Sequence, residues 1–489
     1  MELYSLDEMI MKDFTFLNAQ EFNDAQVCDQ NPNGKRQVLI MEYKGDKPSI
    51  CPRCGGTLYS HGCRTITVTD TPFLGVPTKL DLRVPRRHCQ NKDCGYTWIP
   101  DLEGVDEKRK MTTRTCLKMA NLSLKRSFRD ISGEYGVAYN TVKNTFIDFI
   151  NEKEKNIHFV TPAFLGLDEI KIKKLGEVTV VTDLEHRTLY DMMLGRNQTS
   201  LTEYFSRIPN PENVLWVCTD MYRPFEKTIK SALPNARWVV DHFHIVAYAN
   251  RAMDTVRIAV QSKLSKKQRI ATKKGLAYTL RTRVSKMTME EGAQIKACRQ
   301  RPEMKDLMTA FDLKEDFFNI YDLNMKSKEN AQKAFAEWEK SIPAAPIFEP
   351  FRDLAATVHN FYEEIFNFWD CPLSITNGFT ECTNRIIREN NVKGRGNSFD
   401  ILRARTLYRN ANLERAESNG MLLGPAVMRK GPLFQFEDLD ERDQEIQPEP
   451  FNSFDYDPLI GLIPGVNYDP DTGEIFEDFF DDEEEEENP

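Results

Sequence analysis

Two aspartates stand at the ends of apolar stretches that have the composition of β-strands. Asp168 ends the run AFLGLD, and Asp220 ends the run VLWVCTD. Acids at equivalent places after two strands can meet at the edge of one sheet. Carboxylates that converge on a space about 4 Å wide can hold the two metal ions that assist phosphodiester cleavage. The alternative is that each aspartate is only the polar terminus of a strand.

A third acid, Glu381, stands in the helix-like segment TNGFTECTNRIIREN. Asn377 and Asn384 share its helix face at three- and four-residue spacing, and we expect this helix to pack beside the sheet. A run of basic residues follows, which could neutralise phosphates next to a scissile bond. The alternative is that this run is only a solvated helix face. Its members are Arg385, Arg388, Lys393, Arg395, Arg403 and Arg405.

Two closely spaced cysteine pairs, Cys51-x2-Cys54 and Cys89-x4-Cys94, stand out among the 11 cysteines. Strands between the pairs can fold four thiolates onto one tetrahedral ion, and sulfur ligation favours structural zinc. Cys63 and His61 lie between the pairs, and we interpret both as non-ligands. The alternative is a set of unrelated buried cysteines. Three arginines precede the second pair, namely Arg83, Arg86 and Arg87. They could bind phosphates, or they could form a solvated face of the strand.

The segment SFRDISGEYGVAYNTVKNTFIDF predicts two helices separated at Gly136, as in a helix-turn-helix. The part after the glycine would be the DNA-recognition helix, and a plain helical hairpin is the alternative. Four polar residues of that helix would face the groove or its phosphates, namely Asn140, Thr141, Lys143 and Asn144.

The net charge of -10 hides an uneven distribution along the 489 residues. Residues 437–489 hold 21 Asp and Glu against one Arg, a net of -20, which leaves +10 for residues 1–436. A basic body is compatible with a nucleic-acid partner. No run approaches the roughly 20 apolar residues of a membrane span, and acids stand where a signal peptide has lysines. We therefore expect a cytoplasmic protein.

Changes of pattern along the chain predict a multidomain α/β protein. Residues 1–35 read as a turn-rich lead-in without an element, and three hairpin-connected strands followed by α/β alternation predict a mixed sheet flanked by helices. The expected parts are a lead-in at 1–44, a β-rich zinc ribbon at 45–100, the helix-turn-helix at 105–157, the sheet domain at 160–250 and 371–415, an all-helical insertion at 251–370, and an acidic, disordered tail at 430–489.

The order of these parts resembles the ISL-three family of bacterial insertion-sequence transposases. The resemblance rests on the cysteine ribbon, the helix-turn-helix, GLDE, CTDMY, VVDHFHIV and NGFTECTN followed by a basic helix, and it spans roughly residues 45–415. It implies an RNase H-like catalytic core in which a helical insertion interrupts a DDE triad. Carried onto this sequence, the triad is Asp168, Asp220 and Glu381.

The resemblance also implies a partner and a reaction. The partner is double-stranded DNA, as terminal inverted repeats and as target, bound by a homodimer or larger assembly. Two magnesium or manganese ions would be held by the triad, with Asp168 bridging both. The Asp-x2-His element is Asp241 and His244, and His244 either supports catalysis or is a structural histidine. The alternatives are a repurposed DNA-binding protein and an RNase H-like nuclease without strand transfer.

Two features depart from the family pattern. Cys382 stands where a glycine usually follows the triad glutamate, and the acidic tail is additional. The cysteine could crowd its helix against neighbouring elements, although no catalytic group is lost. The tail's acids can compete with DNA for the basic body, because both are polyanionic.

Deleting residues 437–489 is therefore expected to raise nonspecific DNA affinity at low salt. Electrophoretic mobility shifts of full-length and truncated protein on a random duplex measure the change. Identical binding curves for the two proteins would contradict a competing role for the tail.

Overall fold

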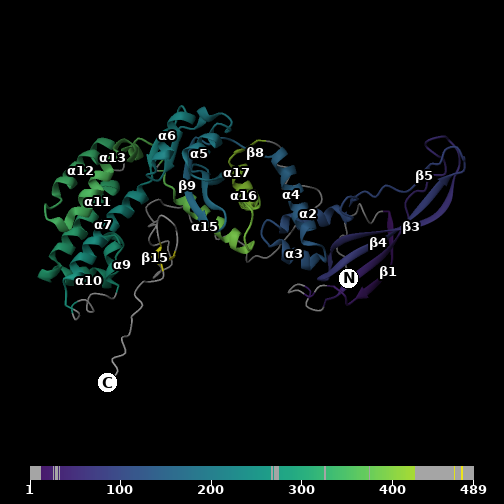
Figure 1. The fold of residues 1–489 in the computed structure, drawn as a ribbon, viewed down its shortest axis with the longest axis horizontal. Helices are drawn as coiled ribbons and strands as arrows, with labels where there is room; N and C mark the ends of the chain where they lie inside the picture. The colour runs from purple at the N-terminus through teal and green to yellow at the C-terminus, as the bar shows by residue number, and fades with distance from the viewer. Residues whose placement is uncertain are drawn as a thin grey trace, which may run out of the picture. The chain divides into compact units, whose positions relative to one another are not determined.

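The computed structural model describes residues 13–25, 27, 31, 34–265, 268, 275–323, 327–373 and 375–423, with two short strands at 467–468 and 475–476. The backbone divides into a first unit, residues 1–159 with 386–445, and a second unit, residues 160–385 with 446–489 (Figure 1). The short strands β15 (Asn467–Tyr468) and β16 (Ile475–Phe476) pair antiparallel. The rest of the predicted acidic tail, from residue 430, lies outside the described residues.

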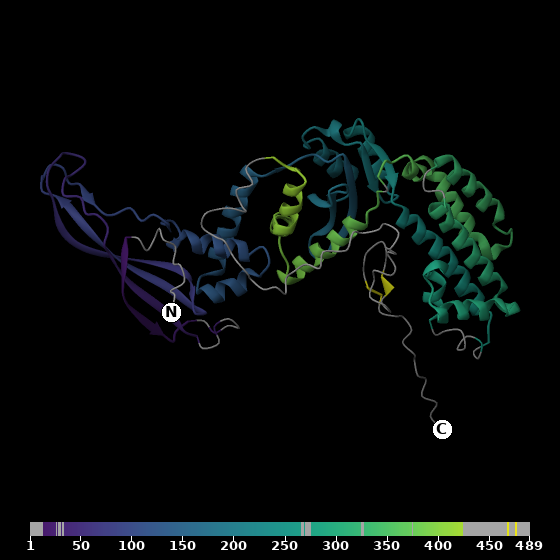
Figure 2. The same cartoon turned by 180° about the vertical axis from the view of Figure 1, so that it is seen from behind.

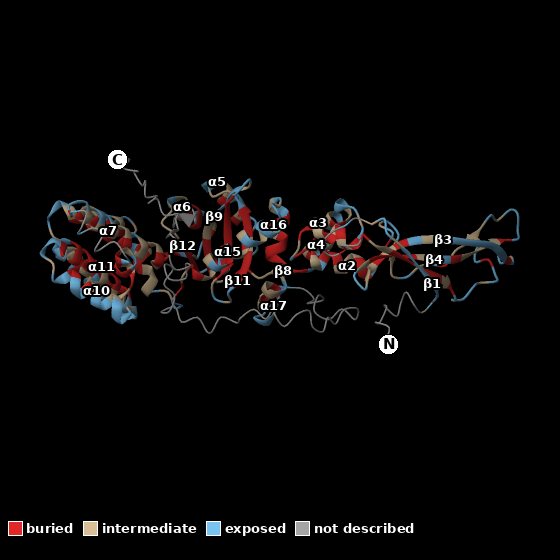
Figure 3. Ribbon diagram, turned by 90° about the horizontal axis from the view of Figure 1, so that it is seen from below, coloured by how far each residue is buried: buried red, intermediate tan, exposed pale blue. Residues whose placement is uncertain are grey.

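The first unit contains a sheet with the strand order β1-β2-β4-β3-β7-β6. Its core includes alternate residues of β4, namely Leu80, Leu82 and Val84, packed with Val68 and Met41. Strands β3 and β4 form a long antiparallel pair, and most of the first half of β3 is exposed, as its blue colour in Figure 3 shows. The strands are β1 (Phe14–Phe22), β2 (Arg36–Tyr43), β3 (Leu58–Phe73), β4 (Val76–Cys89), β5 (Thr97–Trp98), β6 (Val105–Asp106) and β7 (Met111–Thr112).

The expectation that residues 1–35 contain no element is wrong, because Phe14–Phe22 forms β1 and pairs with β2. Strand β1 is exposed along most of its length, so its sequence lacks the apolar alternation that identifies a half-buried strand. Strand β2 in turn runs parallel to β4. The segment preceding the cysteines therefore belongs to the same sheet as the cysteine-bearing hairpin.

Three helices follow the sheet: α2 (Thr113–Leu122), α3 (Phe128–Tyr135) and α4 (Tyr139–Asn156). The hydroxyl of Ser127 caps α3, which ends at Gly136 with φ 62°, a left-handed conformation that glycine adopts without strain. Buried Phe128 and Phe146 pack α3 against α4. The expected pair of helices around Gly136 is therefore present.

The end of the described chain returns to this first unit. Helices α16 (Phe399–Leu407) and α17 (Asn410–Ser418) lead to β14 (Leu422–Leu423), which pairs with β8 (His158–Phe159). The sequence had assigned residues 371–415 to the sheet domain, whereas the structure places residues 386–423 with the first unit.

The second unit contains a mixed sheet with the order β11-β10-β9-β12-β13, as the sequence predicted. Strand β10 pairs antiparallel with β9 and β11, and β12 pairs parallel with β9 and β13. Figure 3 shows β9 and β12 largely buried. The elements are β9 (Phe164–Ile172), β10 (Gly176–Asp183), β11 (Thr188–Leu194), α5 (Gln198–Phe205), η1 (Pro211–Asn213), β12 (Trp216–Thr219), α6 (Arg223–Ala232) and β13 (Arg237–Val240).

A helical region follows β13 in the chain, as expected for an insertion, and Figure 2 shows its helices side by side. None of the described helices is both long and apolar enough to cross a membrane. Its members are α7 (His242–Ser262), α9 (Leu276–Arg281), η2 (Val284–Lys286), α10 (Met289–Arg299), η3 (Pro302–Met304), α11 (Lys305–Leu323), α12 (Lys328–Ser341), η4 (Pro346–Phe348), α13 (Glu349–Asn360), α14 (Tyr362–Phe366) and η5 (Asn367–Trp369).

Helix α15 (Gly378–Lys393) docks against the sheet at its N-terminal end. The side chain of Asn377 donates a hydrogen bond to the carbonyl of Leu167 on β9 at 2.9 Å. The hydroxyls of Thr380 and Thr182 lie 2.7 Å apart. A side chain at Gly166 would place Cβ 2.6 Å from both hydroxyls, so this approach of helix and strand requires glycine.

The substitution Gly166→Ala is therefore expected to destabilise the second unit. The added methyl overpacks a buried contact, which costs about 1–3 kcal/mol, and lowers the melting temperature by roughly 2–4 °C per kcal/mol. Differential scanning calorimetry measures the shift.

The matched control is Gly292→Ala in α10, where an added Cβ meets no atom within 4 Å. Alanine favours a helix over glycine by about 1 kcal/mol, so this variant should melt at or above the wild-type temperature. Equal melting of Gly166→Ala and wild type would contradict the packing argument.

Candidate functional site

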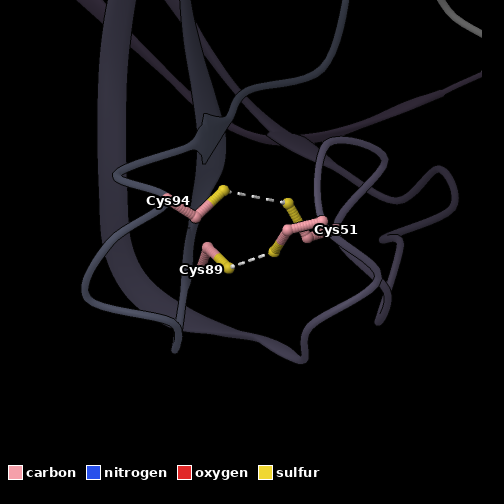
Figure 4. A group of neighbouring side chains, drawn as sticks. Cys51, Cys89 and Cys94 are labelled. Carbon is pink, nitrogen blue, oxygen red and sulfur yellow. Dashed lines mark hydrogen bonds between the residues drawn. The ribbon is translucent and has the colours of Figure 1, made fainter.

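Four cysteines gather at one end of the β3–β4 hairpin. Cys51 and Cys54 lie in the turn before β3, Cys89 ends β4, and Cys94 lies in the turn that follows (Figure 4). The Sγ atoms of Cys51 and Cys94 are 3.8 Å apart, and those of Cys54 and Cys89 are 3.5 Å apart. All four lie within 4.8 Å of one another.

This spacing fits one tetrahedral zinc ion. Zn–S bonds of about 2.3 Å place the sulfurs of a tetrahedron roughly 3.8 Å apart. The backbone amide of Gly56 and the Cys89 side chain lower the pKa of Cys54 to about 7, which favours a thiolate. Burial raises the pKa of Cys89 to about 12, so metal binding must displace protons. Cys63 and His61 are not members of the cluster, in agreement with their interpretation as non-ligands.

The cationic candidates near this cluster differ in their surroundings. Arg83 is exposed on β4, and Arg86 is half-buried. Arg87 donates a hydrogen bond to the carbonyl of Pro48 at 2.8 Å, so it also stabilises the hairpin end. Arg83 is therefore the most accessible of the three to a phosphate.

The polar candidates of α4 lie on its accessible side. Asn140 and Asn144 are exposed one turn apart, and Thr141 and Lys143 are half-buried. The opposite side of the helix buries residues such as Phe146 in the helical core. The structure therefore presents all four predicted contact residues on a surface that a partner can reach.

The basic run after Glu381 does not form one surface. Arg405 is buried, donates a hydrogen bond to the Arg126 carbonyl at 2.9 Å and stacks over Phe128. Arg403 pairs with Glu154 at 2.8 Å. Buried Arg405 holds α16 against the helices of the first unit, so the expectation that it neutralises phosphates is wrong. Arg403 is half-buried, and its phosphate role stays a prediction.

The remaining basic residues of this run are accessible to different degrees. Arg385 is exposed and Arg388 is half-buried. Lys393 lies 3.6 Å from Glu389, and Arg395 lies 3.9 Å from an aspartate on α3. Exposed ion pairs of this kind contribute little to stability, so both cations are free to exchange partners.

Three aspartates stand side by side on adjacent parallel strands. The β12–β9 register pairs Cys218 with Gly166, and its continuation places Asp220 beside Asp168. The β13–β12 register places Asp241 directly after the last pair, beside Asp220. Neighbouring strands are about 4.8 Å apart. The three aspartates therefore lie side by side where β12 and β13 end.

Helix α15 brings Glu381 to this edge. Asn384, one turn further on, donates a hydrogen bond to Oδ2 of Asp168 at 2.6 Å. A donor atom of Glu381 lies within 4.8 Å of donor atoms of Asp241 and His244. Glu381 thus comes together with the Asp-x2-His element, Asp241 and His244, whereas Asp168 and Asp220 are not members of this cluster.

The electrostatics of the site reflect its crowded acids. Burial raises the pKa of Asp241 to about 6. Burial acts to lower the pKa of His244, but Asp241 and three further carboxylates raise it above its usual value. Burial lowers the pKa of neighbouring His242 to about 4, and its ring packs on Phe243 and other aromatic rings. His242 is therefore a structural residue, whereas His244 faces the acids.

A further acid, Glu169, lies next to the candidate triad. Burial and the charges of Asp220 and Asp168 raise its pKa to about 7, against the lowering influence of Arg196. Arg196 binds its Oε2 at 2.7 Å and stacks over Tyr222. The motif GLDE contained this residue, but the sequence could not show that Arg196 would reach it.

Comparisons with known proteins identify relatives of two parts of the chain. Residues 165–406 match the family model described as Transposase, of the ISL3 type, and residues 47–94 match the model described as zinc-finger of transposase IS204/IS1001/IS1096/IS1165. The chain is 24% identical over 228 residues to the transposase for insertion sequence element IS1001 of Bordetella parapertussis. That match covers 46% of this chain and 56% of the relative, so the chain spans about half of the relative's length.

The four-cysteine cluster predicts that Cys54→Ser lowers the zinc content of the purified protein. Hydroxyl oxygen is a poor replacement for a thiolate ligand of zinc. Mass-spectrometric metal analysis should find one zinc per chain in the wild type and clearly less in this variant.

Cys63→Ser is the matched control, because Cys63 is exposed on β3 outside the cluster. It should retain the wild-type zinc content. Full zinc in Cys54→Ser, or an equal loss in both variants, would contradict the assignment of the ligands.

Proposed function

Because the chain belongs to the ISL3 family of transposases, we propose that it is the DDE transposase of a bacterial insertion sequence. In this proposal it binds the element's terminal inverted repeats, cleaves the DNA and joins the freed ends to target DNA in the bacterial cytoplasm. The observation that carries the proposal is the alignment of Asp168 and Asp220 on parallel strands, with Glu381 brought to the same edge by α15.

The strand order supports an RNase H-like catalytic core. Three antiparallel strands, β9 to β11, are extended by the parallel strands β12 and β13 beside β9. A crossover through a helix joins the parallel strands, as parallel pairing requires. The helical insertion separates β13 from α15 in sequence, so Glu381 reaches the sheet from a segment far along the chain.

The residues present fit divalent metal ions. Asp168, Asp220 and Glu381 would hold these ions through their carboxylate oxygens. When bound, magnesium or manganese activates the attacking oxygen and stabilises the leaving oxygen. Without cations, so many carboxylates at one edge repel one another. Oxygen donors of this kind are the ligands that magnesium prefers.

The protein's own residues fix the geometry of both chemical steps. Asn384 orients Asp168 through its hydrogen bond. Asn377 and Thr380 hold the start of α15 against β9 and β10, which sets the position of Glu381. Water attacks phosphorus in the first step, and the freed 3′-hydroxyl attacks in the second. Both steps are in-line displacements, so no covalent protein intermediate is needed.

Recognition of DNA is assigned to the first unit. A structural zinc ion held by the four cysteines would fix the end of the hairpin that carries Arg83 further along β4, and α4 would act as the recognition helix of a helix-turn-helix. The exposed residues Asn140 and Asn144 are suited to base edges, since asparagine can pair with adenine in the major groove. Lys143 would supply charge for phosphates, and exposed Arg385 of the second unit would do the same there. Pairing of two DNA ends requires at least a homodimer.

A cleavage assay on DNA that carries the element's own ends tests the proposal. With magnesium or manganese, wild-type protein should cut at the repeat tips. Asp168→Asn and Glu381→Gln should each reduce the rate at least about a hundredfold, since losing an ion ligand removes several kcal/mol of transition-state stabilisation. DNA binding by both variants should persist.

The control variant is Glu337→Gln, an exposed acid of α12 outside the site, which should cut as the wild type does. Wild-type binding without cleavage would favour a repurposed DNA-binding protein. Cleavage without joining would favour a nuclease, and either outcome would refute the proposed transposase activity.

A further inference from the structure

Three side chains from two segments of the second unit converge at one point. Asp241 is the N-cap of α7, His244 lies in the first turn of α7, and Glu381 lies in the first turn of α15. One donor atom of each lies within 4.8 Å of a donor atom of the other two. Opposite ligands of an ion with bonds of about 2.1–2.2 Å are separated by roughly 4.4 Å. The spacing is therefore compatible with one shared ion.

Two of these residues carry a buried polar atom whose hydrogen-bonding capacity is unused. Asp241 is fully buried, and its Oδ1 accepts a hydrogen bond from the amide of Phe243 at 3.3 Å. Its Oδ2 has no hydrogen-bond partner among the described residues, and neither has Nε2 of His244. Buried polar atoms in folded proteins nearly always have a partner. Two such atoms on neighbouring residues indicate a ligand that contacts both.

The ligand must be positively charged. Besides Asp241 and Glu381, the carboxylates of Asp168 and Asp220 lie near enough to act on the charge of His244. Without a metal ion, a hydrogen bond from His244 to Asp241 would be the way to compensate for the negative charge of these carboxylates. The structure has not formed it at Nε2 or Oδ2, since both atoms lack a partner. Both atoms remain available to a cation.

The donor set determines which cations fit. Magnesium prefers an all-oxygen shell, whereas an imidazole nitrogen favours transition-metal ions. Two carboxylates and one imidazole form a mixed set that these ions accept, with water completing the shell. The set differs from the proposed catalytic triad, which offers oxygen atoms alone.

We propose that Asp241, His244 and Glu381 form a binding site for a divalent transition-metal ion, such as manganese or zinc, in preference to magnesium. The inference deepens the proposed function and rests on it only through Glu381, which the two sets of ligands share. Asp241 thereby becomes a metal ligand in addition to capping α7. His244 becomes the residue that determines metal preference.

The test uses full-length, zinc-loaded protein with Mn²⁺ and no DNA. Pulsed electron paramagnetic resonance of bound Mn²⁺ should detect coupling to a directly ligated nitrogen. His244→Asn should abolish this coupling and lower Mn²⁺ affinity at least about tenfold, while Mg²⁺ affinity changes less. The control His359→Ala removes an exposed histidine of α13 and should preserve both the coupling and the affinity.

A second variant, Asp241→Asn, keeps an oxygen that can accept the Phe243 hydrogen bond but removes the charge. It should weaken Mn²⁺ binding and retain nitrogen coupling in the ion that still binds, so the test does not depend on the folding of His244→Asn. Mn²⁺ bound without nitrogen coupling in the wild type, or equal affinity in all variants, would overturn the proposal. Because DNA is absent, failure of DNA cleavage leaves this result unaffected.

Discussion

The close contact between the start of α15 and strand β9 determines whether the candidate site exists. Gly166 allows the approach, because any side chain there would overlap the hydroxyls of Thr182 and Thr380. Asn377 then satisfies the Leu167 carbonyl at 2.9 Å. The contact spans about two hundred residues of sequence, since the helical insertion lies between its two sides. Without it, Glu381 would have no fixed relation to the aspartates.

Once this contact is made, the parallel register of β9, β12 and β13 supplies the remaining acids. Backbone pairing holds the Cα atoms of Asp168, Asp220 and Asp241 side by side, so the three residues start from neighbouring positions. Burial is the main cause of the raised pKa of Asp241, about 6, and the charge of Asp168 raises this pKa further. Such a site is stable only with protons or cations, which is the electrostatic condition that metal-dependent chemistry uses.

The first unit uses its charges differently. Arg405 was expected to face phosphates, yet it secures α16 against the helical layer through a hydrogen bond, and Arg403 adds an ion pair. A buried arginine requires such partners, because its charge cannot be lost. The accessible candidates that remain in this unit include the exposed side of α4, Arg83, Lys393 and Arg395. DNA recognition is therefore assigned to fewer residues than the basic composition suggested.

The sequence alone determined the features that depend on local spacing. The cysteine pairs, the apolar strands before Asp168 and Asp220, and the helix break at Gly136 are local patterns, and the structure contains the elements they predict. Tertiary structure decided the exposed strand β1, the burial of Arg405 and the entry of Asp241 into the acidic cluster. These depend on contacts between residues distant in the chain, whose register and packing no local pattern encodes.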